Sequence, residues 1–137
     1  MAKSLIKLIN IPKIEDDCYL LFAQTPDHVP FKIKRIYLIL EADPRFKRGK
    51  HAHKKILFCI KGSIKMVLNN GFKKEEVILD KPEQGLIIDN LIWHEMNDFK
   101  KETILLVLAS QTYQASDYIR DYRKFLKSIG KVNDKKY

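Results

Sequence analysis

The stretch that decides the fold is residues 56–79, which read ILFCIKGSIKMVLNNGFKKEEVIL. It holds three short apolar or alternating runs, which are 56–60, 64–68 and 75–79. Asn70-Gly71 stands between the second run and the third and predicts a tight hairpin, because a type I′ turn needs positive φ at both central residues. The stretch therefore predicts three consecutive β-strands joined by turns.

The same pattern continues on both sides of this stretch. Further strands are expected at 5–9, 18–23, 32–40, 85–88 and 103–109. Many short strands at this spacing are typical of a sandwich or barrel and not of a βαβ fold. We therefore predict a single all-β barrel domain over residues 1–137.

The C-terminal part of the chain breaks this pattern. From Ser116 the apolar residues recur at helical spacing, on Tyr118, Ile119, Tyr122, Phe125, Leu126 and Ile129. Ser116 can cap the start of this helix, and Gly130 stands where a residue in the left-handed conformation would end it. We expect a helix over 116–130 that closes the barrel, followed by a tail over 131–137.

Length and composition place the chain among small globular domains. Its 137 residues are 45% hydrophobic, which excludes wholesale disorder. No apolar run approaches the ~20 residues of a membrane span, and the N-terminus lacks the long apolar core of a signal peptide. Cys18 and Cys59 form no CxxC pattern, so we expect two reduced thiols in a cytoplasmic protein.

The chain is basic, with 26 Lys and Arg residues against 17 Asp and Glu and a net charge of +9. Residues 45–55 hold six basic side chains and no acidic one. This charge permits an anionic ligand. The basic residues alternate with histidines and not with aromatic residues, and no helix-turn-helix spacing is present, so we do not expect binding to nucleic acid.

The residues that could carry chemistry include the pair His51-Ala52-His53. If this piece is extended, His51 and His53 point to the same face. The same alternation puts Arg35 and Tyr37 on one face of the expected strand at 32–40. Three apolar residues share that face: Phe31, Ile33 and Ile39. Polar side chains among apolar ones inside a barrel are typical of a ligand site.

Simpler interpretations of these residues stay open. The histidine pair could face solvent, and Tyr37 could be a packing residue. Trp93 could fill the core, and His94 could lie in a surface turn. What favours a site is that all of these residue types occur together in one small barrel.

The segment Gly49-Lys-His-Ala-His53, followed by Gly62 and His94, resembles the two sequence motifs of the cupin superfamily, which are small jelly-roll barrels. His51, His53 and His94 could form a metal site with three nitrogen ligands. Metal-binding cupins place a Glu four or five residues after the His-x-His pair, where this chain has Leu57 and Phe58. The resemblance therefore favours a site without metal, with a tri-histidine metal site as the alternative.

A narrower resemblance covers the chain from about Phe31 to about Leu126. Four segments occur in order: RGKHAHKK at 48–55, WHEMNDF at 93–99, VLAS at 107–110 and DYIR at 117–120. Together they resemble the dTDP-sugar 3,4-ketoisomerases, a metal-independent cupin family. That family converts dTDP-4-keto-6-deoxyglucose to its 3-keto isomer, which feeds an aminotransferase that makes 3-amino sugars for surface glycans or antibiotics. The resemblance implies a cupin-type jelly roll, a dTDP-linked keto-deoxysugar as substrate and no cofactor.

The candidate residues suit this chemistry. Moving a ketone from C4 to C3 requires removal of the C3 proton, an enediol and return of a proton to C4, and imidazole has an ordinary pKa near neutrality. We therefore expect His51 as the principal base, His53 as the second essential imidazole and Tyr37 as an assisting phenol. Arg35 and Arg48 are candidate ligands of the diphosphate, because guanidinium is planar and multidentate. The other substrate-binding residues expected are Lys54, Trp93, His94 and Asn97.

Two other functions stay open. One is a metal-dependent cupin enzyme, either a dioxygenase or a sugar-phosphate isomerase. The other is a non-enzymatic module that binds sugar or nucleic acid through residues 45–55. Stoichiometric iron, zinc or manganese in active protein would favour the first, and binding to an oligonucleotide would favour the second.

The N-terminal segment predicts a homodimer. Leu5-Ile-Lys-Leu-Ile9 is apolar on both faces, and an exposed edge of this kind invites pairing unless something covers it. Asn10-Ile-Pro12 supplies a stiff connection that tends to send a strand outward. The ketoisomerase family is similar in this respect. We expect residues 1–10 of each subunit to join the other subunit's sheet, with pairing inside one subunit as the alternative.

Overall fold

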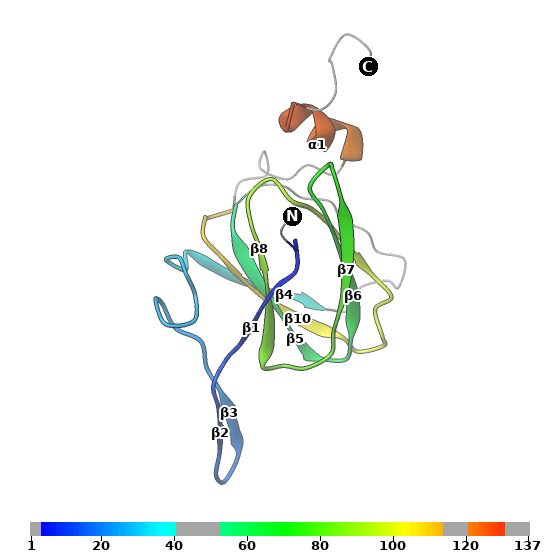
Figure 1. Cartoon of the computed structure of the whole chain (residues 1–137). Coiled ribbons are helices and arrows are strands. Elements are labelled where there is room, and N and C mark those ends of the chain that lie inside the picture. Colours follow the sequence, from blue (N-terminus) through cyan, green and yellow to red (C-terminus); the bar gives the residue numbers. More distant parts are fainter. Residues whose placement is uncertain (1–3, 41–52, 114–120, 131–137) are drawn as a thin grey trace.

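The computed structural model describes residues 4–40, 53–113 and 121–130. Antiparallel strands form a barrel with one short helix at one end (Figure 1). A five-stranded sheet has the order β1 (Lys7–Asn10), β8 (Gln84–Ile88), β5 (Lys55–Lys61), β10 (Ile104–Ala109) and β4 (Arg35–Leu40). A three-stranded sheet has the order β7 (Lys74–Leu79), β6 (Ile64–Asn69) and β9 (Trp93–Asn97). The remaining elements are the hairpin β2 (Lys13–Glu15) and β3 (Tyr19–Leu21) and the helix α1 (Tyr122–Ser128).

The main core lies between the two larger sheets. Side chains alternate along each strand, so Leu57 and Cys59 of β5 meet Met66 and Leu68 of β6 in one buried cluster. Burial raises the pKa of the Cys59 thiol, which suits a packing role. The other face of the five-stranded sheet carries a second cluster, whose buried members are Val29, Ile56, Phe58 and Leu108. The predicted all-β barrel with a C-terminal helix is confirmed.

All eight predicted strands are present, with ends shifted by up to three residues. Two strands were missed. β2 has only three residues, and β9 contains no β-branched residue. β9 is a strand because it pairs along its whole length with the central strand β6, and this pairing outweighs its weak strand propensity.

The turn between β6 and β7 differs from the prediction. Residues 70–73 form it, Gly71 has a φ of 92°, and Asn70 is not in the positive-φ region, so it is no two-residue type I′ turn. The Asn70 side-chain oxygen accepts hydrogen bonds of 2.8 Å from the N–H groups of both Phe72 and Lys73. An Asn side chain that satisfies two turn amides favours the longer loop.

The helix is shorter than predicted. It begins at Tyr122 and its N-cap is Asp121, whose side chain accepts a hydrogen bond of 2.8 Å from the Arg123 N–H. Asp121 has an extended backbone, so the helix cannot run through it from Ser116, which lies outside the described residues, as does the tail at 131–137. The predicted end is confirmed, because Gly130 has a φ of 77° directly after the C-cap.

The strand predicted over 32–40 begins only at Arg35. Arg35, Tyr37 and Ile39 alternate with exposed residues, as expected for one face of a strand. Phe31 and Ile33 do not share that face, because they pack against the second cluster on the outside of the five-stranded sheet. The alternation of inward and outward side chains holds only where β4 is paired with β10, and this pairing ends at Arg35.

Gly62 connects β5 to β6 and is expected to be sensitive to substitution. Its φ is 84°, and a Cβ there would lie 2.8 Å from the Cα of Thr103. Gly62→Ala combines left-handed strain with a backbone clash and should lower the free energy of unfolding in urea by about 2–4 kcal/mol. Gly130→Ala is the matched control, because its φ is 77° and no atom of the described residues lies within 4 Å of a Cβ there. Equal losses at the two glycines would contradict this account.

Candidate active site

One row of residues crosses the five-stranded sheet at the end of the barrel that carries α1. Arg35 is paired in register with Ala109, Ala109 with Lys55, and Lys55 with Ile88. Lys55 has the same parity as Leu57 and Cys59, so its side chain points into the barrel. Lys55 is 1% exposed, and this end of the barrel interior therefore contains a lysine that is out of contact with solvent.

Arg35 and Tyr37 extend inward from β4, next to this row. The Arg35 guanidinium carbon lies 4.9 Å from the centre of the Tyr37 ring and 5.6 Å from the centre of the Tyr113 ring. Cation–π contacts at these distances orient the guanidinium and the phenol together. Tyr37 also packs against the main core, so both roles considered for it, packing and chemistry, are compatible with its position.

The opposite sheet contributes His94. It is 3% exposed and is paired with Leu68 in the centre of the three-stranded sheet, so it lies on an inward-facing position of β9 and not in a surface turn. The Nε of Arg35, the Nζ of Lys55 and the Nδ1 of His94 are all shielded from solvent. The two sheets thus bring three side chains with solvent-shielded nitrogen atoms to one end of the barrel.

Two of the central predicted residues, Arg48 and His51, lie outside the described residues. His53 is described, two residues before β5 begins, and has a φ of 64°. The condition of an extended piece is therefore not met at His53, and alternation along β5 does not fix the direction of His51. His53 still lies at the same end of the barrel as Lys55, because it is only two residues away along the chain.

The side chains of His94 and Met96 point into the barrel from β9. Trp93 and Asn97 lie on the opposite face of that strand. Trp93 is buried against α1, with ring centres 5.2 Å from Tyr122 and 5.7 Å from Phe125. Asn97 is at the other end of the strand, where it pairs in register with Lys65. The structure places Trp93 beside the cluster as a support for α1, and it does not bring Asn97 to the cluster.

Lys54 lies at the rim, with its Nζ 3.5 Å from Asp89. Asp89 also forms an ion pair with Lys7 of β1. Burial works to raise the pKa of Asp89, but the ammonium groups of Lys7 and Lys54 prevail and lower it. Lys54, next to the start of β5, and Lys7 of the N-terminal strand therefore share Asp89 as an ion-pair partner.

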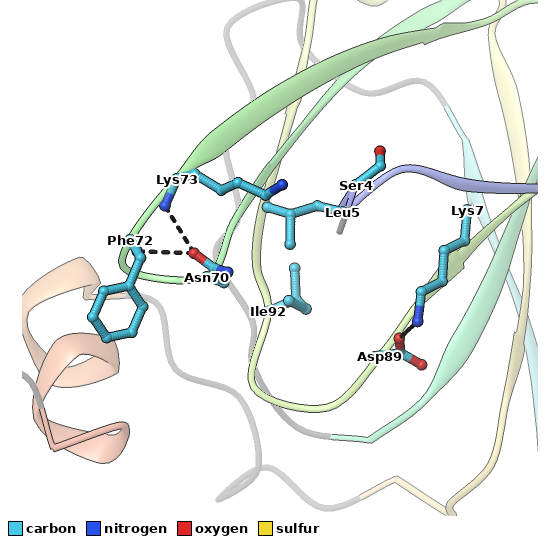
Figure 2. Close-up of a pocket in the computed structure, with 8 residues that line it drawn as sticks. All are labelled: Ser4, Leu5, Lys7, Asn70, Phe72, Lys73, Asp89 and Ile92. Carbon is cyan, nitrogen blue, oxygen red and sulfur yellow. Dashed lines mark hydrogen bonds and ion pairs between the residues drawn. The ribbon is translucent and has the colours of Figure 1, made fainter. Parts of the chain in front are cut away.

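A cavity of about 410 Å³ adjoins this rim, between the start of β1 and the loops after β6 and β8 (Figure 2). Its lysines already have carboxylate partners: Lys7 pairs with Asp89, and Lys73 lies 3.1 Å from Glu75. The Ser4 hydroxyl, which donates a hydrogen bond to Glu75, and Lys73 lower the pKa of Glu75. The lysines that line this cavity are therefore balanced by carboxylates beside it.

Lys55 is the residue that the sequence analysis missed. The signal was present in its parity with Leu57 and Cys59, which lie in the apolar run 56–60. Residues 48–55 include four Lys or Arg residues, and sequence alone does not distinguish the lysine that faces inward from its neighbours until the strand is placed.

Within the described ranges, no group of three His, Cys, Asp or Glu side chains is arranged to hold a metal ion. Leu57, at a position where metal-binding cupins carry a glutamate, is buried in the main core. The cluster instead offers imidazole, phenol and cationic nitrogen, which are groups for proton transfer and for holding an anion.

Comparison with known proteins matches this site to a family. The family model "FdtA: WxcM-like, C-terminal" matches residues 4–130. A TDP-4-oxo-6-deoxy-alpha-D-glucose-3,4-oxoisomerase from Aneurinibacillus thermoaerophilus is 42% identical over 93% of this chain and 94% of its own. The chain belongs to the FdtA family of sugar 3,4-ketoisomerases. The resemblance drawn from the sequence motifs is thereby confirmed.

Solved structures of the FdtA family have the same fold as this member. A 3,4-ketoisomerase from Helicobacter canadensis has a TM-score of 0.85 and 38% identity, covering 91% of this chain and 97% of its own. A mutant of the ketoisomerase QdtA from Thermoanaerobacterium thermosaccharolyticum, in complex with TDP-4-keto-6-deoxyglucose, has a TM-score of 0.84 and 34% identity over 93% and 95%. These comparisons identify the chain as an isomerase with a cupin-type barrel and do not support the metal-dependent alternative.

Proposed function

We propose that this chain moves the keto group of dTDP-4-keto-6-deoxyglucose from C4 to C3. The observation that carries the proposal is the cluster of Arg35, Tyr37, Lys55 and His94 inside the barrel of a 3,4-ketoisomerase family member. The product is a 3-keto sugar, which is the form that an aminotransferase needs to make a 3-amino-3,6-dideoxy sugar. Incubation with this substrate and identification of the product tests the proposal.

In the proposed reaction His51 removes the proton from C3. The C–H electron pair forms a double bond between C3 and C4, and the C4 carbonyl electrons move onto its oxygen. The C3 hydroxyl then gives up its proton, which passes to the C4 oxygen, as C3 becomes the ketone, and C4 takes up a proton from a protonated imidazole. In this proposal His53 and Tyr37 carry protons between these positions, which requires each of them to lie within hydrogen-bond reach of the atom it serves.

The substrate's diphosphate requires cations near the barrel opening. Arg35 is half-buried and lies under the exposed ring of Tyr113, so it bridges the interior and the surface. We assign Arg35 and Arg48 to the diphosphate and Lys54 to the rim beside it. In this proposal His94 contacts the sugar from the opposite sheet, and Trp93 acts indirectly by supporting α1 beside the site.

Activity is expected to survive exhaustive chelation. The imidazoles and the phenol carry out the proton transfers in this proposal, and Leu57 and Phe58 stand where a carboxylate ligand would be. Turnover before and after dialysis against EDTA, with metal content measured on the same sample, tests this. Loss of activity that one divalent ion restores would overturn it in favour of a metal-dependent cupin.

We also propose that the enzyme is a homodimer in which the N-terminal strand is exchanged. In this single chain β1 pairs with β8 at the edge of the five-stranded sheet, and exchange would make the same pairing between two subunits. The β2–β3 hairpin extends away from the barrel (Figure 1) and exposes three large apolar residues: Ile14, Tyr19 and Leu20. An isolated two-stranded hairpin is marginal in water, so contact with a second subunit would stabilise it.

We place the enzyme in the cytoplasm. Cys18 is exposed and Cys59 is buried, and both are free thiols, which suits a reducing compartment. No helix within the described ranges has the length and hydropathy that crossing a bilayer requires. Fractionation of cells that express the chain, with blotting of each fraction, tests this placement.

A further inference from the structure

Strand β4 is apolar on both of its faces. Tyr37 and Ile39 pack against the main core, and Ile36, Leu38 and Leu40 alternate with them on the outer face. Each of these three outer side chains is more than half exposed. Alternate residues of a strand lie about 7 Å apart, so the three form one continuous row, which we name the β4 strip. A contiguous apolar patch on a protein surface marks an interaction site, whereas scattered apolar residues do not.

The rest of this outer face is already covered by the chain itself. Val29, Phe31 and Ile33, from the segment before β4, pack in the second cluster against residues of β5 and β10. An antiparallel sheet that faces water normally carries polar residues on that side. The five-stranded sheet is therefore built to be covered on its outer face, and the β4 strip is a part that stays exposed.

The three-stranded sheet shows the ordinary pattern of a face in water. On its outer side the Lys65 ammonium group of β6 lies 3.9 Å from the Glu76 carboxylate of β7. Ile78 is the exposed apolar residue of the edge strand β7, and it is paired in register with Lys65. A single exposed apolar residue among charged ones needs no partner, whereas the row of three on β4 calls for one.

The β2–β3 hairpin presents another apolar surface. Ile14 and Leu20 are paired in register, so their side chains lie together on one face of the hairpin, and both are about half exposed. On the other face the Lys13 Nζ lies over the Tyr19 ring, 4.5 Å from its centre. The face with Ile14 and Leu20 is therefore the apolar side of the hairpin.

The hairpin and the β4 strip lie at opposite edges of the same sheet. β1, which leads into the hairpin, and β4 are its outermost strands, and about 19 Å along the sheet separates them. The hairpin also extends away from the barrel (Figure 1), so it does not cover the strip of its own chain. In a two-fold dimer, however, the hairpin of each copy can lie on the strip of the other, which covers both surfaces at once.

Charge also favours a second copy at this place. The chain has a net charge of +9, so two copies repel each other unless an acidic surface of one meets a basic surface of the other. Asp16 and Asp17 are exposed at the turn of the hairpin, and Lys32 and Lys34 are exposed just before β4. The hairpin and the strip thus carry flanking charges of opposite sign.

We propose that the β4 strip is the surface on which the β2–β3 hairpin of a second copy of this chain packs. The inference goes beyond the proposed reaction, and it rests on the proposed homodimer but not on the exchange of β1. A cavity of about 290 Å³ at the end of the strip, lined by Leu40 and Ile104 among others, gives room for a side chain of the partner. The partner thereby covers the outer side of the strand that carries Arg35 and Tyr37.

Leu38→Lys tests the strip. Leu38 is 54% exposed, so the single chain should keep its fold, which circular dichroism checks, but the dimer would have to bury a charge. We expect the Kd of the dimer in sedimentation equilibrium to rise by about 10²-fold or more, because a two-fold contact contains the substitution twice. Ile78→Lys is the matched control, since it adds the same charge at a 59% exposed outward position of another edge strand.

Cross-linking tests which part of the partner lies on the strip. Cys18 is an exposed thiol next to β3 of the hairpin. In Leu38→Cys, a short bismaleimide should join Cys18 of one chain to the introduced thiol of the other, and mass spectrometry of the linked peptides identifies the pair. Ile78→Cys, treated in the same way, should not give a link between position 78 and Cys18.

An unchanged dimer in Leu38→Lys, or equal weakening by Leu38→Lys and Ile78→Lys, would overturn the inference. Dimeric Leu38→Cys whose introduced thiol does not link to Cys18 would also overturn it, because another part of the partner would then occupy the strip. A wild-type chain that is monomeric at all concentrations would overturn this inference together with the proposed homodimer. Failure of the wild-type chain to isomerise the substrate would overturn the proposed reaction instead.

Discussion

Replacing His51 with asparagine is expected to lower kcat by about 10²-fold or more, which is the scale of a lost general base. An amide is similar in size to imidazole but cannot accept a proton near neutral pH, so C3 deprotonation loses its acceptor. Turnover of dTDP-4-keto-6-deoxyglucose and TDP binding are measured on the same preparation. TDP binding should persist, because the diphosphate contacts are assigned to arginines.

His28→Asn is the matched control for this variant. His28 lies in the loop before β4, where its Nδ1 accepts a hydrogen bond of 3.2 Å from the Gln24 N–H and its ring packs edge-on against Phe22. The next residue, Val29, packs in the second cluster on the outer face of the five-stranded sheet, so replacement of His28 should leave turnover unchanged. Near wild-type turnover in His51→Asn, or an equal loss in both variants, would contradict the assignment of His51 as the base.

Deleting residues 1–10 is expected to abolish activity and the dimer together. The deletion removes β1, which uncovers the edge of β8, and it removes Leu5 and Ile6, which pack against the main core. It also removes the Lys7 partner of Asp89 and the Ser4 hydroxyl that binds Glu75. Light scattering should then detect a monomer or an aggregate, and turnover should be lost.

Removal of residues 131–137 is the control for shortening the chain, because these residues lie beyond the segment that the family model matches. This variant should remain dimeric and active. A fully active dimer that lacks residues 1–10 would show that the N-terminal strand does not hold the subunits together.

The strand pattern was predictable because most strands combine apolar alternation with clear turn signals. β9 was not, because Trp-His-Glu-Met-Asn has no such pattern and becomes a strand only through its pairing with β6. The turn at Asn70-Gly71 was placed correctly but not its type, since the choice depends on side-chain hydrogen bonds to Phe72 and Lys73. The local sequence therefore predicted where this turn lies but not its backbone geometry.

For the candidate site, residue types were easier to predict than orientation. Arg35 and Tyr37 were placed together correctly, because both lie within the regular part of β4. Alternation does not apply at His53, which has a φ of 64° that no residue pattern predicted, and the shared face of His51 and His53 stays a prediction because His51 lies outside the described residues. The sequence analysis named Lys54 as a substrate-binding residue and did not name Lys55, although of these two lysines only Lys55 is buried. Neighbouring residues of a strand point to opposite faces, so the strand must be placed before the inward lysine can be identified.

The product of the reaction tests the central claim most directly. The wild-type chain is incubated with dTDP-4-keto-6-deoxyglucose, and the sugar is examined by proton and carbon NMR without separation. The account predicts a ketone at C3 and a new proton on C4, with the 6-deoxy group and the dTDP linkage intact. An unchanged 4-keto sugar at stoichiometric enzyme, or a product that is epimerised but still has its ketone at C4, would contradict it.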